Sequence, residues 1–282
     1  MNLLGQNLLT NSEIAKRIVV ALDIRDGDFV VEVGPGQGAL TDFLVEKPVS
    51  LLLAIEKDYK LVEFLRKKYG SRKKIKIVHN DVLRIDRIVI PTETEESLKN
   101  TKGSLDGVYP ELVEWARDDE RDYKLISNLP YSITSFFINK FFVSGEMEKP
   151  EKAVLMVQKE VAERLTSKPG EKNRGILSVL LQACCEVEKL FDVARENFTP
   201  TPGVESAVIK IIPRKKNLDP RFIALVKAGF SAKRQKLANS LSQKLEMPKT
   251  EIADIIKSAG ISENARAEDL GVNEWEKLVN RN

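Results

Sequence analysis

The chain has 282 residues, enough for one large α/β domain and a smaller second one. Its 42% hydrophobic and 31% charged residues exclude a disordered or fibrous protein, while a net charge of +3 is too small to indicate a partner. A single histidine, His79, and the adjacent pair Cys184 and Cys185 give no zinc-ligand spacing, so we expect reduced thiols and no metal. No run of residues is apolar over a membrane-spanning length and no signal-like segment opens the chain, so we expect a cytoplasmic protein without membrane contact.

Near the N-terminus, a glycine-rich turn at residues 34–38 follows a predicted buried strand at residues 28–33. A helix opens after it at Ala39. Strand, glycine turn and helix N-terminus together are the usual setting for a nucleotide-like ligand, because glycine allows a tight turn and close approach of the backbone. Gly34, Gly36 and Ala39 also satisfy a dinucleotide pattern, so the glycines alone leave NAD as an alternative.

Three carboxylates stand at the ends of successive predicted strands: Glu32, Glu56 and Asp81. Each one alone is typical of a solvated strand end. Together, with no Lys or Arg expected nearby, they form a poor site for a pyrophosphate but an acceptable one for a cationic sulfonium. The acids therefore favour a binding site for a positively charged, nucleoside-like molecule.

The stretch Asn128-Leu129-Pro130-Tyr131 follows the predicted strand at residues 123–127. Proline cannot donate to a sheet ladder and pushes its predecessor into extended geometry, so the strand must end here. The Asn128 side-chain oxygen and the Pro130 carbonyl could each accept one N–H of an exocyclic amine, while Tyr131 stacks on the ring that carries it. The alternative is a plain strand end with a turn proline.

In the second half, Phe198 precedes a stretch in which Pro200 and Pro202 fix the backbone, and a strand is predicted at residues 206–212. A rigid loop that presents Phe198 could sandwich a flipped base against Tyr131, although Phe198 alone would be interpreted as a core residue. Further elements are predicted as a helix from Ser12, strands at 51–55, 75–78 and 152–157, helices at 133–142 and 158–165, and a mobile basic loop at 168–174.

After a linker at residues 213–220 the chain is predicted to be helical to its end. From Lys210 onward 15 basic residues oppose 9 acidic ones, a net charge of 15 − 9 = +6. Lys233, Arg234 and Lys236 lie close together in this region, and such a charge run is either a solvated helix face or a contact with an RNA backbone.

Three motifs carry a resemblance to a known family. Residues 5–9 (GQNLL), the tetrapeptide at 128–131 and residues 198–206 (FTPTPGVES) are similar to those of the ribosomal RNA adenine dimethyltransferases, and most closely to the enzymes that act on 16S rRNA. The resemblance implies a Rossmann-like, doubly wound α/β methyltransferase domain at residues 1–213 and a small helical RNA-binding domain at residues 214–282.

The same resemblance implies an activity and a set of site residues. The activity is dimethylation of the N6 amino groups of two adjacent adenosines near the 3′ end of 16S rRNA, with S-adenosylmethionine as methyl donor. The expected partner is the precursor of the small ribosomal subunit, and the protein is expected to be a monomer. The resemblance assigns catalysis to the tetrapeptide through Asn128, Pro130 and Tyr131, together with Phe198. The implied cofactor-binding residues are Asn7, Leu9, Gly34, Gly36, Glu56, Asp81 and Asn128.

Some positions depart from the family pattern: Leu8, Ser132, Thr201 and Gly203. A larger departure is an insertion at about residues 87–121, in which residues 88–120 carry three bases and nine acids, 3 − 9 = −6, and should therefore lie away from RNA. Three alternatives stay open: a 23S rRNA methyltransferase of the antibiotic-resistance type, a non-catalytic rRNA-binding assembly factor and, third, a dinucleotide-dependent oxidoreductase.

Overall fold

The computed structural model describes residues 7–88, 122–214, 216–232 and 234–280. Most of the predicted insertion, and Lys233, lie outside these residues. Within them, the main sheet has seven strands in the order β4-β3-β2-β5-β6-β9-β7. The strands are β2 (Phe29–Val33), β3 (Leu51–Glu56), β4 (Ile75–His79), β5 (Tyr123–Asn128), β6 (Lys152–Gln158), β7 (Cys185–Val193) and β9 (Ser206–Pro213).

The strands β4, β3, β2, β5 and β6 run parallel to one another, whereas β9 pairs antiparallel with both β6 and β7. Every residue of β2 is buried, as are five of the six residues of β3 and of β5. Such continuous apolar strands are expected where helices cover both faces of a parallel sheet. The Rossmann-like α/β architecture predicted from the sequence is confirmed.

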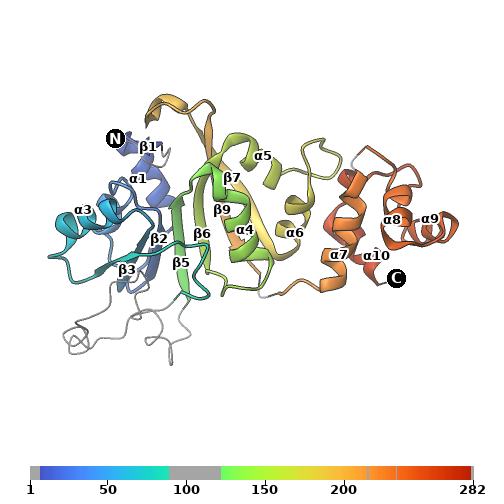
Figure 1. The fold of residues 1–282 in the computed structure, drawn as a ribbon, viewed down its shortest axis with the longest axis horizontal. Coiled ribbons are helices and arrows are strands. Elements are labelled where there is room, and N and C mark those ends of the chain that lie inside the picture. Colours follow the sequence, from blue (N-terminus) through green and yellow to red (C-terminus); the bar gives the residue numbers. More distant parts are fainter. Residues whose placement is uncertain (1–6, 89–121, 215, 233, 281–282) are drawn as a thin grey trace.

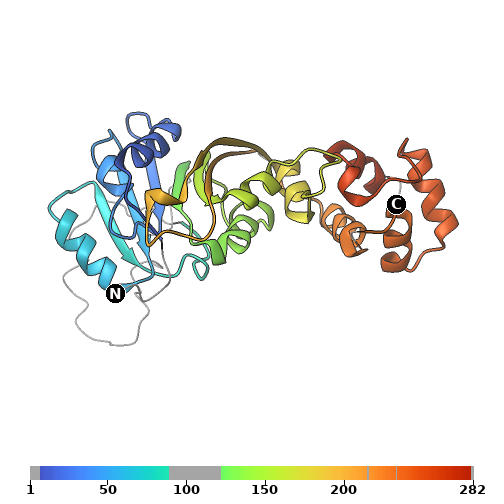
Figure 2. The same cartoon turned by 90° about the horizontal axis from the view of Figure 1, so that it is seen from above.

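Helices cover both faces of the sheet, as Figures 1 and 2 show. One face packs on α1 (Ser12–Ala21), α2 (Thr41–Leu44) and α3 (Tyr59–Tyr69), and the other on α4 (Thr134–Ile138), α5 (Lys159–Leu165) and α6 (Ile176–Cys184). Neighbouring strand residues alternate between the two apolar clusters: Val30 belongs to the first and Val31 to the second. The predicted helix at 133–142 is observed as α4 followed by a π-helical stretch, Asn139–Val143.

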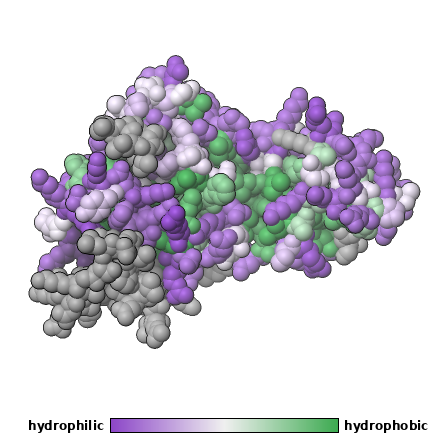
Figure 3. Space-filling view, viewed as in Figure 1, coloured by the Kyte–Doolittle hydropathy of each residue, from purple (hydrophilic) through white to green (hydrophobic). Residues whose placement is uncertain are grey.

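A helical region follows β9 and consists of α7 (Pro220–Gly229), α8 (Leu237–Leu245), α9 (Lys249–Ser258) and α10 (Val272–Val279). Trp275 is fully buried and stacks on Phe230, with ring centroids 6.1 Å apart. A Cβ at Gly229 would collide with the Trp275 ring, so only glycine fits there. The apolar cluster on the α4–α6 side of the sheet continues into these helices, and Figure 3 shows hydrophobic residues gathered between α4 and α7.

The loop at residues 168–174 ties the sheet region to the helical region. Arg174 is fully buried and donates hydrogen bonds to the Ser167 carbonyl and, at 2.7 Å, to Gln182 Oε1. The Gly170 N–H donates to the Glu268 carbonyl across the two regions at 2.9 Å. The loop is thus anchored at Gly170 and Arg174, although residues 168–172 are exposed, and its mobility stays a prediction. No helix in the described part of the chain is long and apolar enough to cross a membrane.

Candidate active site

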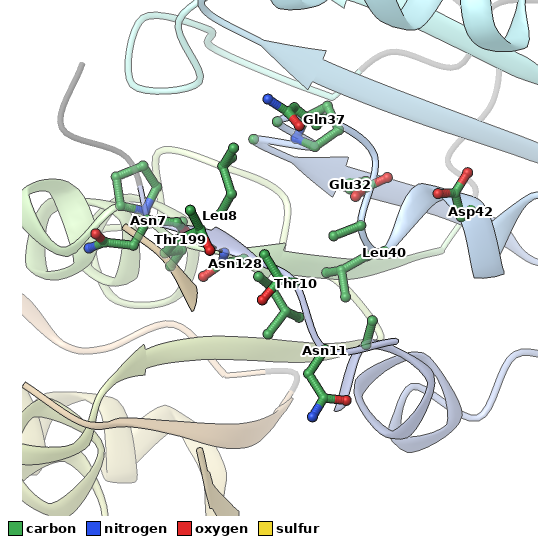
Figure 4. A pocket seen from close by; sticks show the side chains of 18 of the residues that line it. Asn7, Leu8, Thr10, Asn11, Glu32, Gln37, Leu40, Asp42, Asn128 and Thr199 are labelled. Atoms are coloured by element: carbon green, nitrogen blue, oxygen red, sulfur yellow. Dashed lines mark hydrogen bonds between the residues drawn. The ribbon is translucent and has the colours of Figure 1, made fainter. Parts of the chain in front are cut away.

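A cleft of about 890 Å³ opens at the carboxyl ends of β2 and β5. In the sheet, β3 and β4 lie on the β2 side of this point, and β6 lies on the β5 side. Open α/β sheets bind ligands at such a switch point, where the strand order reverses. Figure 4 shows Asn7, Asn128 and Thr199 on one side of the cleft and Glu32, Gln37 and Asp42 on another. None of the residues that line the cleft in the described part of the chain is a lysine or arginine.

The glycine turn after β2 forms one wall of the cleft. Gly34 and Gly36 have φ of +65° and +60°, the left-handed region in which a side chain is strained. The Gly36 N–H donates to Glu56 Oε2 at 3.1 Å. Glu56 Oε1 accepts two more backbone N–H groups, from Lys57 at 2.8 Å and from Asp58 at 2.9 Å. Glu56 lies behind the turn rather than on the cleft surface, and its carboxylate holds the turn in place.

Glu32, the last residue but one of β2, is buried and lines the cleft. Its Oε2 accepts one hydrogen bond, from the Thr41 hydroxyl at 2.7 Å, where α2 begins. Burial raises the pKa of Glu32 to about 8, the Thr41 hydrogen bond opposes this shift, and the negative charge of Glu56 adds to it. Glu32 is thus a carboxyl group that would be stabilised in its ionised form by a cation in the cleft.

The third predicted acid, Asp81, is paired. Its Oδ2 lies 2.9 Å from Lys57 Nζ, and its Oδ1 accepts the Leu83 N–H at 3.0 Å. Partial burial opposes ionisation, but the Lys57 and Leu83 hydrogen bonds outweigh it and lower the pKa of Asp81. The expectation that no Lys or Arg lies near the strand-end acids is wrong at this position, because Lys57 leaves β3 in the direction of the neighbouring β4 end.

Asn128 ends β5 and faces the cleft. Its amide nitrogen donates to the Asn7 carbonyl at a long 3.5 Å, so its Oδ1 is the atom left to accept a hydrogen bond. The Pro130 carbonyl already accepts the Ile133 N–H at 3.1 Å and the Thr134 hydroxyl at 3.3 Å. Within the described residues the Leu129 carbonyl receives no hydrogen bond. The carbonyl acceptor predicted at Pro130 is therefore occupied by its own turn, and the one at Leu129 is available.

Tyr131 follows this turn and lines the cleft. Its hydroxyl is 2.8 Å from the hydroxyl of Ser206, a fully buried residue at the start of β9, which fixes the direction of the ring. Phe198, in contrast, is only 3% exposed, belongs to the apolar cluster on the α1–α3 side of the sheet and does not line the cleft. The expectation that a rigid loop presents the Phe198 ring opposite Tyr131 is wrong for this conformation, because the ring points into the core.

Phe198 is held there by a short ribbon, in which β8 (Phe198–Thr199) pairs antiparallel with β1 (Leu8–Leu9). The Thr10 N–H and hydroxyl both donate to the Asn197 carbonyl, at 2.8 and 3.0 Å. This pairing places residues 7–10 along the cleft. Two sequence motifs some 190 positions apart thus form one wall.

The structure brings most of the predicted residues to one place. The predicted residues that line the cleft are Asn7, Leu9, Gly34, Gly36, Asn128, Pro130 and Tyr131. Glu56, Asp81 and Phe198 do not line it. Glu32, predicted as one of the strand-end acids of the site, also lines the cleft. The prediction missed Gln37 and Asp42, although Gln37 borders the glycines and could have been found by its position.

The predicted RNA-contact residues lie in the helical region. Arg234 is exposed, and Lys236 is exposed and donates to Asn264 Oδ1 at 2.6 Å, immediately before α8. Lys233 lies outside the described residues. Neither of the two described residues faces the cleft, which leaves their role independent of the chemistry there.

The sequence and the fold were compared with those of known proteins. Residues 2–282 match the model of the ribosomal RNA adenine dimethylase family. A ribosomal RNA small subunit methyltransferase A of Prosthecochloris aestuarii is 35% identical over 281 residues, which cover 99% of this chain and 92% of the relative. A protein of the same name from Fusobacterium nucleatum subsp. nucleatum is 36% identical, with 98% and 94% covered.

Among solved structures, a dimethyladenosine transferase of Plasmodium falciparum has a TM-score of 0.73 at 25% identity and covers 96% of this chain and 95% of that one. The 23S rRNA methyltransferase ErmE has a TM-score of 0.69 at 22% identity, with 98% and 99% covered, and shows the likeness of fold alone. The family match extends over nearly the whole chain and includes every residue of the cleft. The chain belongs to the ribosomal RNA adenine dimethylase family.

Proposed function

We propose that this protein transfers methyl groups from S-adenosylmethionine to the N6 nitrogen of two adjacent adenosines near the 3′ end of 16S rRNA. Family membership supports the dimethylation of rRNA adenine, and the relatives at 35% and 36% identity carry small-subunit names. The single observation that carries the assignment of the chemistry is the Asn128 side chain, held at the cleft with its oxygen left as an acceptor. The dinucleotide-dependent oxidoreductase considered from the glycine pattern is ruled out by the family.

The cleft fits the methyl donor. The acids Glu32 and Asp42 line it, Asp42 in an ion pair with Lys68, and no described lining residue is a lysine or arginine, which suits a cation and disfavours a pyrophosphate. When bound, S-adenosylmethionine supplies an electrophilic methyl group on a positively charged sulfur. The residues we assign to holding it are Asn7, Leu9, Gly34, Gly36, Glu56, Asp81 and Asn128. Of these, Glu56 acts from behind the turn, with one carboxylate lone pair left beyond the three backbone N–H groups it accepts.

Asn128 Oδ1 and a main-chain carbonyl of the tetrapeptide accept the two N–H groups of the adenine amine. We assign the carbonyl role to Leu129, because that of Pro130 already has two donors. Acceptors on both N–H bonds draw the nitrogen lone pair out of conjugation with the ring, so that it can attack without a strong base. Catalysis is then mainly positioning and electrostatic stabilisation.

Tyr131 stacks on the target adenine, with its ring direction set by Ser206. Phe198 joins the stack only after its ring has left the core, since it is 3% exposed. Outside the cleft, Lys233, Arg234 and Lys236 contact RNA phosphates, because no aromatic or amide ladder accompanies them to recognise bases. We further propose a monomer that acts on the small-subunit precursor in the cytoplasm.

The test is single-turnover methyl transfer by Asn128→Ala, with Asn139→Ala, an exposed asparagine beyond α4, as matched control. Removing one oriented polar group should lower the rate about 100- to 1000-fold while RNA binding changes little. Asn139→Ala should behave as the wild type. A loss of less than about tenfold in Asn128→Ala, about 1.4 kcal/mol, would contradict the amine-orienting role.

A further inference from the structure

The strongest concentration of positive charge lies not in the helical region but along α3 and the turn that follows it. Residues 57–76 contain nine Lys or Arg and two acids, 9 − 2 = +7, which exceeds the +3 of the whole chain. Between positions 66 and 76 there are seven cations and no acid, and all seven are exposed. The cations of this second stretch are Arg66, Lys67, Lys68, Arg72, Lys73, Lys74 and Lys76.

Only part of this charge is neutralised locally. Lys68 pairs with Asp42 at 2.8 Å, and Arg72 pairs with Glu46 at 2.8 Å. Arg66 donates to the Ile77 carbonyl, which does not reduce its charge. The cations without an ion pair to any described residue are Lys60, Arg66, Lys67, Lys73, Lys74 and Lys76.

Two of these lysines share a face of α3 with an exposed aromatic residue. Lys60, Phe64 and Lys67 stand at i, i+4 and i+7 of α3, so they share one helix face, and Phe64 is 47% exposed on it. α3 begins three residues after Glu56, at the edge of the sheet that holds the cleft, and its 11 residues span about 16 Å. Further exposed lysines follow at 73 and 74, before the edge strand β4, and at 76 within it.

Charged side chains on an edge strand can simply prevent unwanted strand pairing. The strand at the opposite edge of the same sheet, β7, carries charges of both signs, with Glu186, Glu188 and Asp192 beside Lys189. Mixed charge is enough to protect an edge. The single sign of the charge at residues 66–76 is therefore not explained by edge protection.

We propose that this α3 surface (Lys60, Phe64, Lys67, Lys73, Lys74 and Lys76) binds the sugar-phosphate backbone of the RNA substrate, with Phe64 stacking on a base. The inference rests on the proposed function only in taking RNA as the substrate. Unpaired exposed lysines match a chain of phosphates, and an exposed aromatic among them suits an unstacked base. Figure 1 places α3 at the end of the molecule opposite α7–α10, so the RNA is held at both ends with the cleft between.

The test is the salt dependence of binding to unmethylated small ribosomal subunits, between about 50 and 200 mM salt. The triple variant Lys67→Gln, Lys73→Gln, Lys74→Gln should lose about 0.7–0.9 unit of slope in log K against log salt for each lysine that contacts a phosphate. Replacing the same three residues with arginine should keep the wild-type slope. All three side chains are exposed, and thermal unfolding checks that the variants fold.

The control removes three cations that already have acidic partners: Lys189→Gln, Arg195→Gln and Lys210→Gln. Equal slopes in the test and control triples would overturn the proposal and leave the α3 lysines as protection for β4. Because the assay needs no methyl transfer, a wild type that binds with a steep slope but does not methylate would contradict the proposed function and not this surface.

Phe64 is tested separately. Phe64→Ala should weaken binding several-fold at every salt concentration without changing the slope, because stacking involves no counterion release. Phe64→Tyr should restore the affinity. An unchanged affinity in Phe64→Ala would remove base stacking from the proposal.

Discussion

Glu32 is the last residue but one of β2 and Glu56 is the last residue of the neighbouring β3, and both are 1% exposed, yet they have different hydrogen-bond partners. Glu56 accepts three backbone N–H groups, so its negative charge is stabilised by the protein itself. Glu32 accepts a single hydroxyl, and burial raises its pKa to about 8. Two buried glutamates on neighbouring strands, two positions apart in the register of the sheet, thus have different roles.

This difference in hydrogen bonding shows which of the two carboxyl groups a bound ligand can stabilise. A carboxylate that is fully paired by the backbone holds the glycine turn in shape whether or not anything is bound. A buried carboxyl group with one side-chain partner is not stabilised in its ionised form until a cation binds beside it, since isolated buried charge is costly. Glu56 therefore holds the glycine turn of the site in shape, whereas the ionisation of Glu32 depends on the charge of the bound ligand.

The largest effect should come from Glu56→Ala. It leaves the buried Gly36 N–H without an acceptor and weakens the turn, at a cost of about 1–3 kcal/mol for each buried donor left unpaired. We expect a lower free energy of unfolding in chemical denaturation and, by calorimetry, a loss of S-adenosylmethionine affinity. Glu63→Ala, an exposed glutamate of α3, is the control. A fully stable Glu56→Ala with wild-type affinity would erase the distinction between the two acids.

Glu32→Gln should have a smaller effect that depends on pH. A carboxyl whose pKa is raised from 4.5 to about 8 on folding contributes stability below pH 4.5, and that contribution is lost as the pH rises through about 8. The amide does not titrate, so the stability of Glu32→Gln relative to wild type should increase from pH 5 to pH 9. Parallel unfolding curves across this range would contradict the raised pKa.

Glu32→Gln also tests whether Glu32 senses the positive charge of the methyl donor. Ionised Glu32 should favour the cationic methyl donor over its neutral product, S-adenosylhomocysteine, and this preference should grow with pH in the wild type. Glu32→Gln should show a preference that does not vary with pH. Calorimetry with both compounds measures the ratio, and a pH-independent ratio in the wild type would show that Glu32 does not sense the sulfonium charge.

A smaller change is expected for Thr41→Val, which removes the one hydrogen bond to Glu32. A single buried hydrogen bond to a charged group contributes about 1.5–3 kcal/mol, and less when its acceptor is protonated. The destabilisation should therefore be larger at pH 9 than at pH 6. Thr10→Val, whose hydroxyl bonds a backbone carbonyl in the β1–β8 ribbon, should show no such pH dependence and serves as the control.

The smallest effect is expected for Lys57→Ala, which frees Asp81. The Lys57 side chain is 66% exposed, and ion pairs at the surface are typically worth about 0–1 kcal/mol. Stability should change by no more than this, and the pKa of Asp81, read by NMR, should rise toward its ordinary value. A stability loss comparable to that of Glu56→Ala would show that Asp81 belongs with the structural acids.

Local patterns were enough to predict most of the regular structure. Apolar runs bounded by Gly, Pro and Asn gave strands within a residue or so of β2, β5 and β6, since parallel strands buried on both faces are continuous in the sequence. The same patterns could not show that Arg174 is a buried anchor. A basic Pro/Gly loop is usually exposed. Arg174 is buried because it donates to Gln182, and the loop is also held by the hydrogen bond from Gly170 to the Glu268 carbonyl.

By itself the sequence determined the strand ends, the glycine turn and the position of Asn128, because each depends on residues adjacent in the chain. Only the tertiary structure decided how Glu56 reaches Gly36, how Ser206 orients Tyr131 and that Phe198 packs into the core. Periodicity tells which face of a strand is buried but not which distant segment lies against it. The β1–β8 pairing joins segments about 190 residues apart, and no local pattern encodes that register.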